Sequence, residues 1–208
     1  DTQDCKPQYP ELTREQKNSW QYKQMTNEKY EAGKCCKETG IYPFRFGSDE
    51  YHRYKEDIAL FAEMGMKIYR LSISWARIFP NGDDEKPNLA GIEYYKNVFA
   101  ECRKHHIKVF VTMLHYAIPV HLVDEYGGWK NRKLVDFYLR YAKTLFENFK
   151  DDVDFWLPFN EINAGRFNPY NGVGLIKERE ENYDQSVYQA IHHQFIAVSY
   201  THLRAHET

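Results

Sequence analysis

The sequence predicts an α/β fold in which short, buried β-strands alternate with amphipathic helices. Three apolar, β-rich runs carry this prediction, because each is too short for a typical helix and too apolar for a solvated antiparallel strand. The runs begin at steps of roughly 40 residues, with a helical pattern between one and the next. They are residues 66–74 (MKIYRLSIS), 107–114 (IKVFVTML) and 153–159 (VDFWLPF). This alternation indicates parallel strands covered on both faces, in an open sheet or a (β/α) barrel.

The helices are predicted from apolar residues that recur at helical spacing. The first begins after the candidate N-cap residues Ser48 and Asp49 and ends at Gly65. Similar patterns predict helices over residues 90–105, 132–150 and 183–197. Within the last of these, His192 and His193 are expected at the surface. Residues 1–47 are polar and irregular, with one candidate short, exposed helix over residues 28–37.

Composition narrows the class of protein. A chain of 208 residues is one domain or two small ones. Lys and Arg total 28 and Asp and Glu total 30, so the near-neutral balance predicts no nucleic acid and no membrane surface as partner. Hydrophobic residues make up 42% and aromatic residues 16%, which is enough for a sizeable core. No run of about 18 apolar residues predicts a transmembrane helix.

Two further features predict a cytoplasmic location. The N-terminal stretch has no apolar core of the kind found in signal peptides. The four cysteines, Cys5, Cys35, Cys36 and Cys102, form no Cys-x-x-Cys pair. Their spacing suits neither a disulfide framework nor a zinc site, so we expect reduced thiols.

Polar side chains follow all three predicted strands where functional residues of βα folds gather, at the carboxyl ends. Arg70 lies in the first strand, His115 ends the second, and Asn160 and Glu161 follow the third. A carboxyl enclosed at such an end is partly desolvated, which disfavours its charged form and suits a general acid. Glu161 is therefore the candidate catalytic residue, unless it caps the following turn or pairs with a lysine.

Metal and nucleotide sites find little support. His115 and His121 could share a metal ion, but no third ligand stands at a suitable spacing, so no metal is predicted. No glycine-rich phosphate loop follows a strand, and Gly127–Gly128 precedes Trp129 in a turn. We therefore expect no cofactor, and a nucleotide-dependent oxidoreductase is disfavoured.

Long stretches of the chain resemble glycoside hydrolase family 1. They are residues 51–82 (YHRYKEDIALFAEMGMKIYRLSISWARIFPNG), 112–149 (TMLHYAIPVHLVDEYGGWKNRKLVDFYLRYAKTLFENF) and 155–163 (FWLPFNEIN), in the family's order. The amino-acid sequences of the second and third stretches look most like those of the bacterial 6-phospho-β-glucosidase branch. The resemblance implies a fragment of a (β/α)8 TIM barrel, from about its first helix to its fourth.

The resemblance also implies a role for each candidate residue. Glu161 would be the general acid/base of a retaining β-glycosidase, and Asn160 would bind the sugar 2-hydroxyl. His115 would bind a glycone hydroxyl, and Arg70 would lie beneath the catalytic nucleophile and keep it ionised. The substrate would be a small carbohydrate, a phosphorylated β-glucoside, hydrolysed in the cytoplasm.

Departures from the family qualify these expectations. The strand that carries the nucleophile is not recognisable, so the 208-residue chain by itself is expected to be inactive and poorly stable. The alternative is a non-catalytic, sugar-binding homologue. We expect an irregular segment over residues 1–47, a partial glycosidase domain over 48–198, and a tail over 199–208 that does not continue the family helix. Pro158, where threonine is common, would remove a hydrogen bond from the strand ladder.

Overall fold

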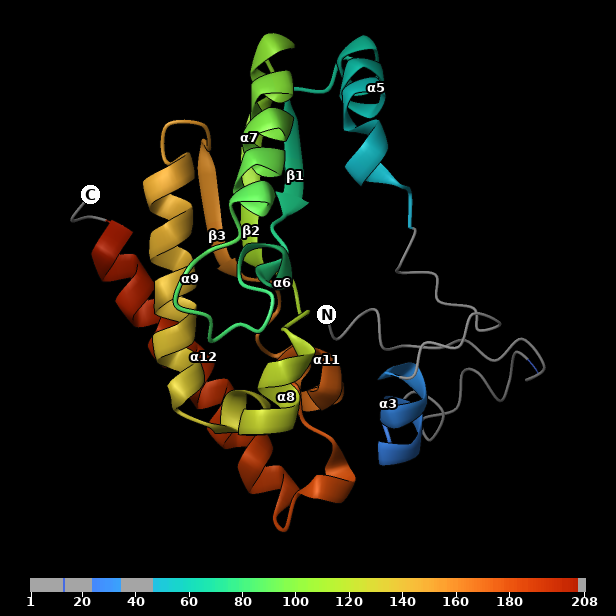
Figure 1. Cartoon of the computed structure of the whole chain (residues 1–208), viewed down its shortest axis with the longest axis vertical. Coiled ribbons are helices and arrows are strands. Elements are labelled where there is room, and N and C mark those ends of the chain that lie inside the picture. The colour runs from blue at the N-terminus through green and yellow to red at the C-terminus, as the bar shows by residue number, and fades with distance from the viewer. Residues whose placement is uncertain (1–12, 14–23, 35–46, 206–208) are drawn as a thin grey trace.

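A computed structural model provides the three-dimensional structure, and it describes residues 13, 24–34 and 47–205. The described residues fold into three strands and a series of helices (Figure 1). In chain order these are α3 (Asn27–Lys34), α5 (Glu50–Glu63), β1 (Ile68–Ser72), α6 (Trp75–Ile78), α7 (Leu89–Lys104), β2 (Lys108–Leu114), α8 (Val120–Tyr126), η1 (Gly128–Lys130), α9 (Lys133–Phe149), β3 (Phe155–Phe159), α10 (Ala164–Phe167), α11 (Pro169–Val173), η2 (Lys177–Arg179) and α12 (Tyr183–Ala205).

The three strands form one parallel sheet in the order β1-β2-β3, at the positions that the apolar runs predict. Arg70 pairs with Phe110, which in turn pairs with Phe155, so these three residues lie in one row across the sheet. The strand arrows in Figure 1 point the same way. The carboxyl ends of all three strands therefore meet at one edge, where the predicted site residues lie.

One face of the sheet carries the core. Helices α7 and α9 lie over this face in Figure 1, and α12 packs against α9. The strand residues that point toward the helices, among them Val109 and Val111, are buried. Trp75 is fully buried and stacks on Tyr141 of α9, with ring centroids 5.4 Å apart. Burial of this aromatic layer fixes α9 against the strand ends.

The other face of the sheet is open, which corrects the expectation that the strands are covered on both faces. Ile68 is 50% exposed and Phe155 is 45% exposed, and Arg70 and Lys108 are exposed between them. At the carboxyl end of β2 the same face is covered locally, because Thr112 and Leu114 are buried. In a closed (β/α)8 barrel the face opposite the helices lines the interior and is filled by side chains of the other strands.

Two tyrosines of α9 hold the carboxyl ends of the strands. The Tyr138 hydroxyl donates to the Pro158 carbonyl at 2.7 Å. The Tyr141 hydroxyl lies 2.7 Å from the Met113 carbonyl and 3.1 Å from that of Ile73. Burial raises the pKa of both hydroxyls well above the usual value, so both remain proton donors. Hydroxyl groups from one helix thus contact carbonyls at the ends of all three strands.

Pro158 is accommodated at the end of β3. The pairing of β2 with β3 passes from Thr112↔Leu157 to Leu114↔Phe159 and skips the proline. Pro158 is the last residue but one of the strand. The missing N–H of a proline is tolerated near the end of a strand. The Pro158 carbonyl accepts a hydrogen bond from the Tyr138 hydroxyl.

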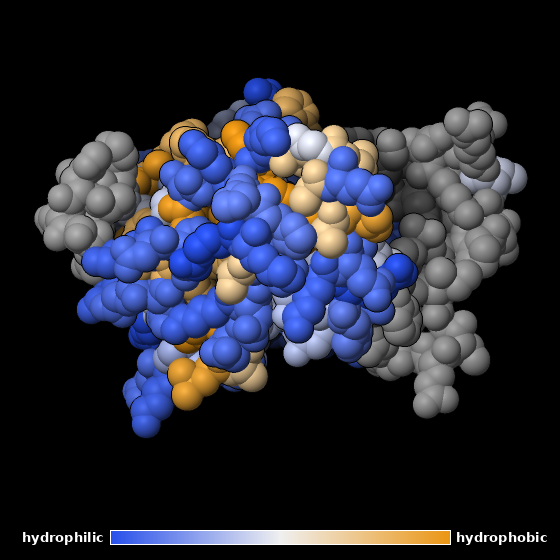
Figure 2. Space-filling view, turned by 90° about the horizontal axis from the view of Figure 1, so that it is seen from above, coloured by the Kyte–Doolittle hydropathy of each residue, from blue (hydrophilic) through white to orange (hydrophobic). Residues whose placement is uncertain are grey.

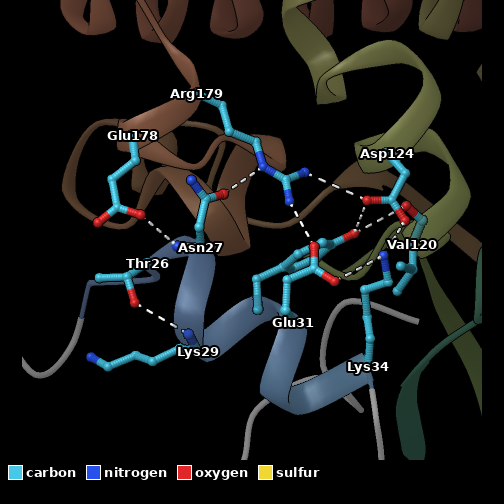
Figure 3. Close-up of polar contacts among 10 residues, drawn as sticks. Thr26, Asn27, Lys29, Glu31, Lys34, Val120, Asp124, Glu178 and Arg179 are labelled. Carbon is cyan, nitrogen blue, oxygen red and sulfur yellow. Dashed lines mark hydrogen bonds and ion pairs between the residues drawn. The ribbon is translucent and has the colours of Figure 1, made fainter.

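The N-terminal helix α3 packs against the loops that follow β2 and β3, as Figure 3 shows. Its Tyr30 is fully buried, with the Arg179 guanidinium 4.7 Å above the ring and the hydroxyl 2.9 Å from Asp124. Lys34 also binds Asp124, and Arg179 binds Glu31. The helix predicted over residues 28–37 is therefore present as Asn27–Lys34, and residues 35–37 lie outside the described residues. The sequence predicts an exposed helix, but Tyr30 and Gly33 are buried.

The last helix differs from expectation in two respects. It continues to Ala205, beyond the end at residue 197 that the apolar spacing predicts. His193 is buried rather than at the surface, because its ring contacts the Trp129 carbonyl at 2.8 Å and Gln189 at 2.8 Å. No three potential metal ligands lie together in the described residues, His192 and His193 included.

Cys102 is a free, buried thiol, and burial raises its pKa to about 11. The predictions for Cys5, Cys35 and Cys36 fall outside the described residues.

Seen along the sheet from the end where the strands begin, the surface is mainly hydrophilic, with hydrophobic side chains between the hydrophilic ones (Figure 2). None of the helices in the described part combines the length and apolar character that a bilayer span requires.

Candidate active site

The carboxyl ends of the three strands bring the predicted site residues together. The Arg70 guanidinium donates from Nη2 to Asn160 Oδ1 at 2.8 Å, across 90 positions of sequence. From Nε it donates to Thr112 Oγ1 at 3.0 Å, and it lies 5.6 Å from the centre of the Phe110 ring. One side chain of β1 therefore spans β2 and reaches the residue that follows β3.

Asn160 is held by its backbone as well as by its side chain. Its N–H donates to the Leu114 carbonyl at 2.9 Å, which extends the β2–β3 ladder beyond Phe159. The chain turns immediately afterwards, at Glu161, which has a φ of 43°. A non-glycine residue is uncommon in this left-handed region, and such residues gather at functional sites.

His115 lies between the charged groups of the site. Partial desolvation lowers its pKa, the Arg70 guanidinium lowers it further, and the Glu161 carboxylate opposes both effects. Its ring meets the Tyr116 ring edge-on at 4.9 Å. The neutral imidazole is thus favoured, and a neutral ring can both accept and donate hydrogen bonds.

Tyr116 is a site residue that the sequence reasoning did not identify. Its hydroxyl donates a hydrogen bond to Glu161 Oε2. Tyr116 has a φ of 68° and lies at the centre of a tight turn. This turn is closed by a hydrogen bond from the Ala117 N–H to the His115 carbonyl at 2.8 Å. In sequence it looks like one of 17 tyrosines, so only its place directly after His115 could have drawn attention to it.

Glu161 is exposed, whereas the sequence analysis predicts a carboxyl that is partly desolvated at the strand end. The reason is the open face of the sheet: burial at this position depends on the closing of a barrel around it. Glu161 is also the one carboxylate among the strand-end residues of the described chain. It therefore offers one half of a two-carboxylate site.

The alternative sites of the sequence analysis have structural explanations. His121 contacts Asp83 at 3.1 Å, and no group of three potential metal ligands lies together in the described residues. Gly128 has a φ of 70°, and a Cβ there would lie 2.5 Å from the Val173 carbonyl oxygen. The second glycine of this pair is required by close backbone packing.

The parallel sheet, with its covering helices and the polar residues at the carboxyl ends of its strands, is part of a (β/α)8 barrel, as its superposition on solved beta-glucosidases shows. The sequence profile of glycosyl hydrolase family 1 matches residues 20–207, and the chain belongs to this family.

Curated relatives agree with this assignment. The chain is 53% identical to the 6-phospho-beta-glucosidase AscB of Escherichia coli (strain K12) over 167 residues, which are 80% of this chain and 35% of that protein. It is 54% identical to the aryl-phospho-beta-D-glucosidase BglH of Bacillus subtilis (strain 168) over 159 residues, which are 76% and 34% of the two chains. The chain thus spans about a third of the length of these relatives.

Solved structures support the same fold. A beta-glucosidase from Thermotoga maritima in complex with glucoimidazole superposes with a TM-score of 0.68 at 33% identity, over 77% of this chain and 36% of that one. A rice beta-glucosidase superposes with a TM-score of 0.66 at 35% identity, over 72% and 33% of the two chains.

Proposed function

We propose that this chain supplies the acid/base half of a retaining β-glucosidase active site, and that its substrates are 6-phospho-β-glucosides in the cytoplasm. The observation that carries the proposal is the convergence of Arg70, His115, Asn160 and Glu161 on one edge of the sheet. The phosphorylated substrate is inferred from the names of the relatives, AscB and BglH among them. No residue of the described chain is assigned to the phosphate.

In this mechanism Glu161 acts twice. Protonated, it gives its proton to the glycosidic oxygen while a nucleophilic carboxylate attacks the anomeric carbon, so the aglycone leaves as an alcohol. Ionised, it then takes a proton from the water that attacks the glycosyl–enzyme bond, which frees the nucleophile. The nucleophile must lie about 5–5.5 Å from Glu161, on a strand that the described residues do not include.

The neighbours of Glu161 suit the remaining roles. Asn160 accepts from Arg70 through Oδ1, and its amide group also contacts the Tyr116 hydroxyl, which leaves one amide N–H for the sugar 2-hydroxyl. His115, biased toward its neutral form, can bind a second glycone hydroxyl. Arg70 presents a fixed cation at the open face of the sheet, where an opposing carboxylate would be held in its ionised form.

The test is a hybrid enzyme in which residues 48–197 replace the matching part of the E. coli relative AscB. We expect the hybrid to hydrolyse a chromogenic 6-phospho-β-glucoside, and Glu161→Gln to lower its kcat/KM by about 10²–10⁴-fold, the usual contribution of a general acid. The 208-residue chain alone should release no chromophore, because it holds one carboxylate of the pair.

The control is Glu147→Gln, an equally conservative change at an exposed carboxylate of α9 that pairs with Lys143. It should leave the hybrid's activity unchanged. Undiminished hydrolysis after Glu161→Gln would remove the acid/base assignment. A hybrid that binds the sugar phosphate but hydrolyses nothing would favour the sugar-binding alternative.

A further inference from the structure

The residue that follows His115 turns out of the strand and toward the carboxylate of the site. β2 ends at Leu114, and two residues later the Tyr116 hydroxyl donates to Glu161 Oε2. Asn160 is a second side-chain partner of that hydroxyl. Tyr116 thus joins the loop after β2 to both polar residues that follow β3.

The backbone on both sides of this contact is unusual. The hydrogen bond from the Ala117 N–H to the His115 carbonyl closes a three-residue turn with Tyr116 at its centre, at a φ of 68°. A positive central φ marks the rarer and more strained form of this turn. Glu161, at a φ of 43°, is strained in the same sense. Two residues in costly conformations are therefore bonded to each other, as expected where geometry serves a site.

We propose that Tyr116 is a positioning residue for Glu161. The Tyr116 hydroxyl binds Oε2 of the Glu161 carboxyl group, so Oε1 is left to give and take the proton. This inference rests on the proposed acid/base role of Glu161. In the ionised carboxylate both oxygens accept hydrogen bonds. When Oε1 carries the proton, Oε2 is the carbonyl oxygen and still accepts from Tyr116. The same contact can therefore hold the carboxyl in both steps of the reaction.

The charged and titratable groups around Glu161 are consistent with this role. Tyr116 and His115 face it from the loop after β2, and Arg70 approaches from β1 through Asn160. Burial and the bond to Glu161 raise the pKa of the Tyr116 hydroxyl, so it remains a donor at neutral pH. A phenylalanine would keep the ring and remove only this donor.

The first test compares leaving groups in the hybrid enzyme. A methyl or phenyl 6-phospho-β-glucoside needs protonation as it leaves, whereas a dinitrophenyl glycoside does not. We expect Tyr116→Phe to lower kcat/KM about tenfold for the first kind of substrate and less than about twofold for the second. In the Glu161→Gln background the same change should cost less than about twofold, because two residues that act as a unit are not additive.

Tyr126→Phe is the matched control. Tyr126 ends α8, which follows β2, and its hydroxyl also donates to a carboxylate, that of Asp83, at 2.8 Å. This change should leave both substrates within about twofold of the parent enzyme. Equal losses of kcat/KM for the two kinds of leaving group after Tyr116→Phe, or additive losses with Glu161→Gln, would overturn the proposal.

The second test requires no activity. In the 208-residue chain with 13C-labelled tyrosine, Glu161→Gln should lower the pKa of Tyr116, assigned from Tyr116→Phe, and leave that of Tyr126 unchanged. The titration is repeated on the hybrid, so misfolding of the shorter chain does not remove the test. An unchanged Tyr116 pKa would overturn the pairing. A hybrid that is inactive with both residues intact would instead remove the proposed function, while the titration still decides the contact.

Discussion

At the scale of single residues, the candidate site is an electrostatic unit built on Arg70. Its guanidinium bonds Thr112 and Asn160 and lies close enough to His115 to bias that ring toward its neutral form. Arginine suits this position because it is always charged and presents several donors in one plane. The sequence indicates each residue separately; the structure shows that they bond one another.

This unit predicts the titration of His115. Desolvation and then Arg70 lower the pKa of His115, so Arg70→Met should raise it, but not fully to the usual value, because the desolvation remains. As the pH falls through the pKa that His115 has in the unfolded chain, the unfolded chain binds more protons than the folded one, so the free energy of unfolding decreases. The decrease should be smaller in the Arg70→Met variant. NMR titration of the His115 ring measures the change. Arg103→Met, which removes an exposed partner of Asp152, is the control and should leave His115 unmoved.

At the scale of elements, α9 determines where the strand ends lie. Its amphipathic pattern is strong, and the sequence predicts the helix correctly. Less visible is the use of two of its apolar-face residues, Tyr138 and Tyr141, as hydrogen-bond donors to the strands. A tyrosine at a core position reads as packing in sequence, because only the fold shows which carbonyl its hydroxyl meets.

We predict that Tyr141→Phe destabilises the hybrid by about 1–3 kcal/mol, the cost of leaving buried carbonyls without a donor. The Met113 and Ile73 carbonyls lose their shared partner while the ring still fills its place. Urea unfolding measures the change in free energy. Tyr188→Phe on α12, where the side chain is 57% exposed, is the control and should cost little. Equal stability of the two variants would contradict this role of α9.

At the scale of the whole molecule, the open sheet face governs behaviour. Ile68 and Phe155 expose large apolar side chains, and β1 and β3 are sheet edges within the described residues. Such edges and faces pair with other chains unless they are covered. α3 illustrates the opposite case, because its buried Tyr30 and its ion pairs cover part of the loop surface.

We therefore predict that the 208-residue chain alone aggregates on heating and shows no cooperative thermal transition. It should also bind a hydrophobic dye, and replacing Ile68 and Phe155 together with serine should reduce that binding. Differential scanning calorimetry and dye fluorescence check the two parts. The hybrid enzyme, in which the same face is enclosed, is the comparison. A sharp, reversible transition of the chain alone would contradict the prediction.

Sequence by itself determined the alternation of strands and helices, the family, and the four predicted residues at the strand ends. These follow from local patterns: apolar runs, helical spacing, and polar residues where a run stops. The contacts of α3 and the burial of His193 could not be predicted in this way. Both join residues far apart in the chain, and no local pattern encodes which distant group a side chain meets.

Only the tertiary structure decided that Tyr116 bonds Glu161, that Arg70 bonds Asn160, and that Glu161 remains exposed. The first two depend on how strand register and a strained turn bring side chains together in space. The third depends on which face of the sheet is covered. Burial is a property of the assembled layers, so a pattern that identifies a strand cannot tell how many of its faces the protein encloses.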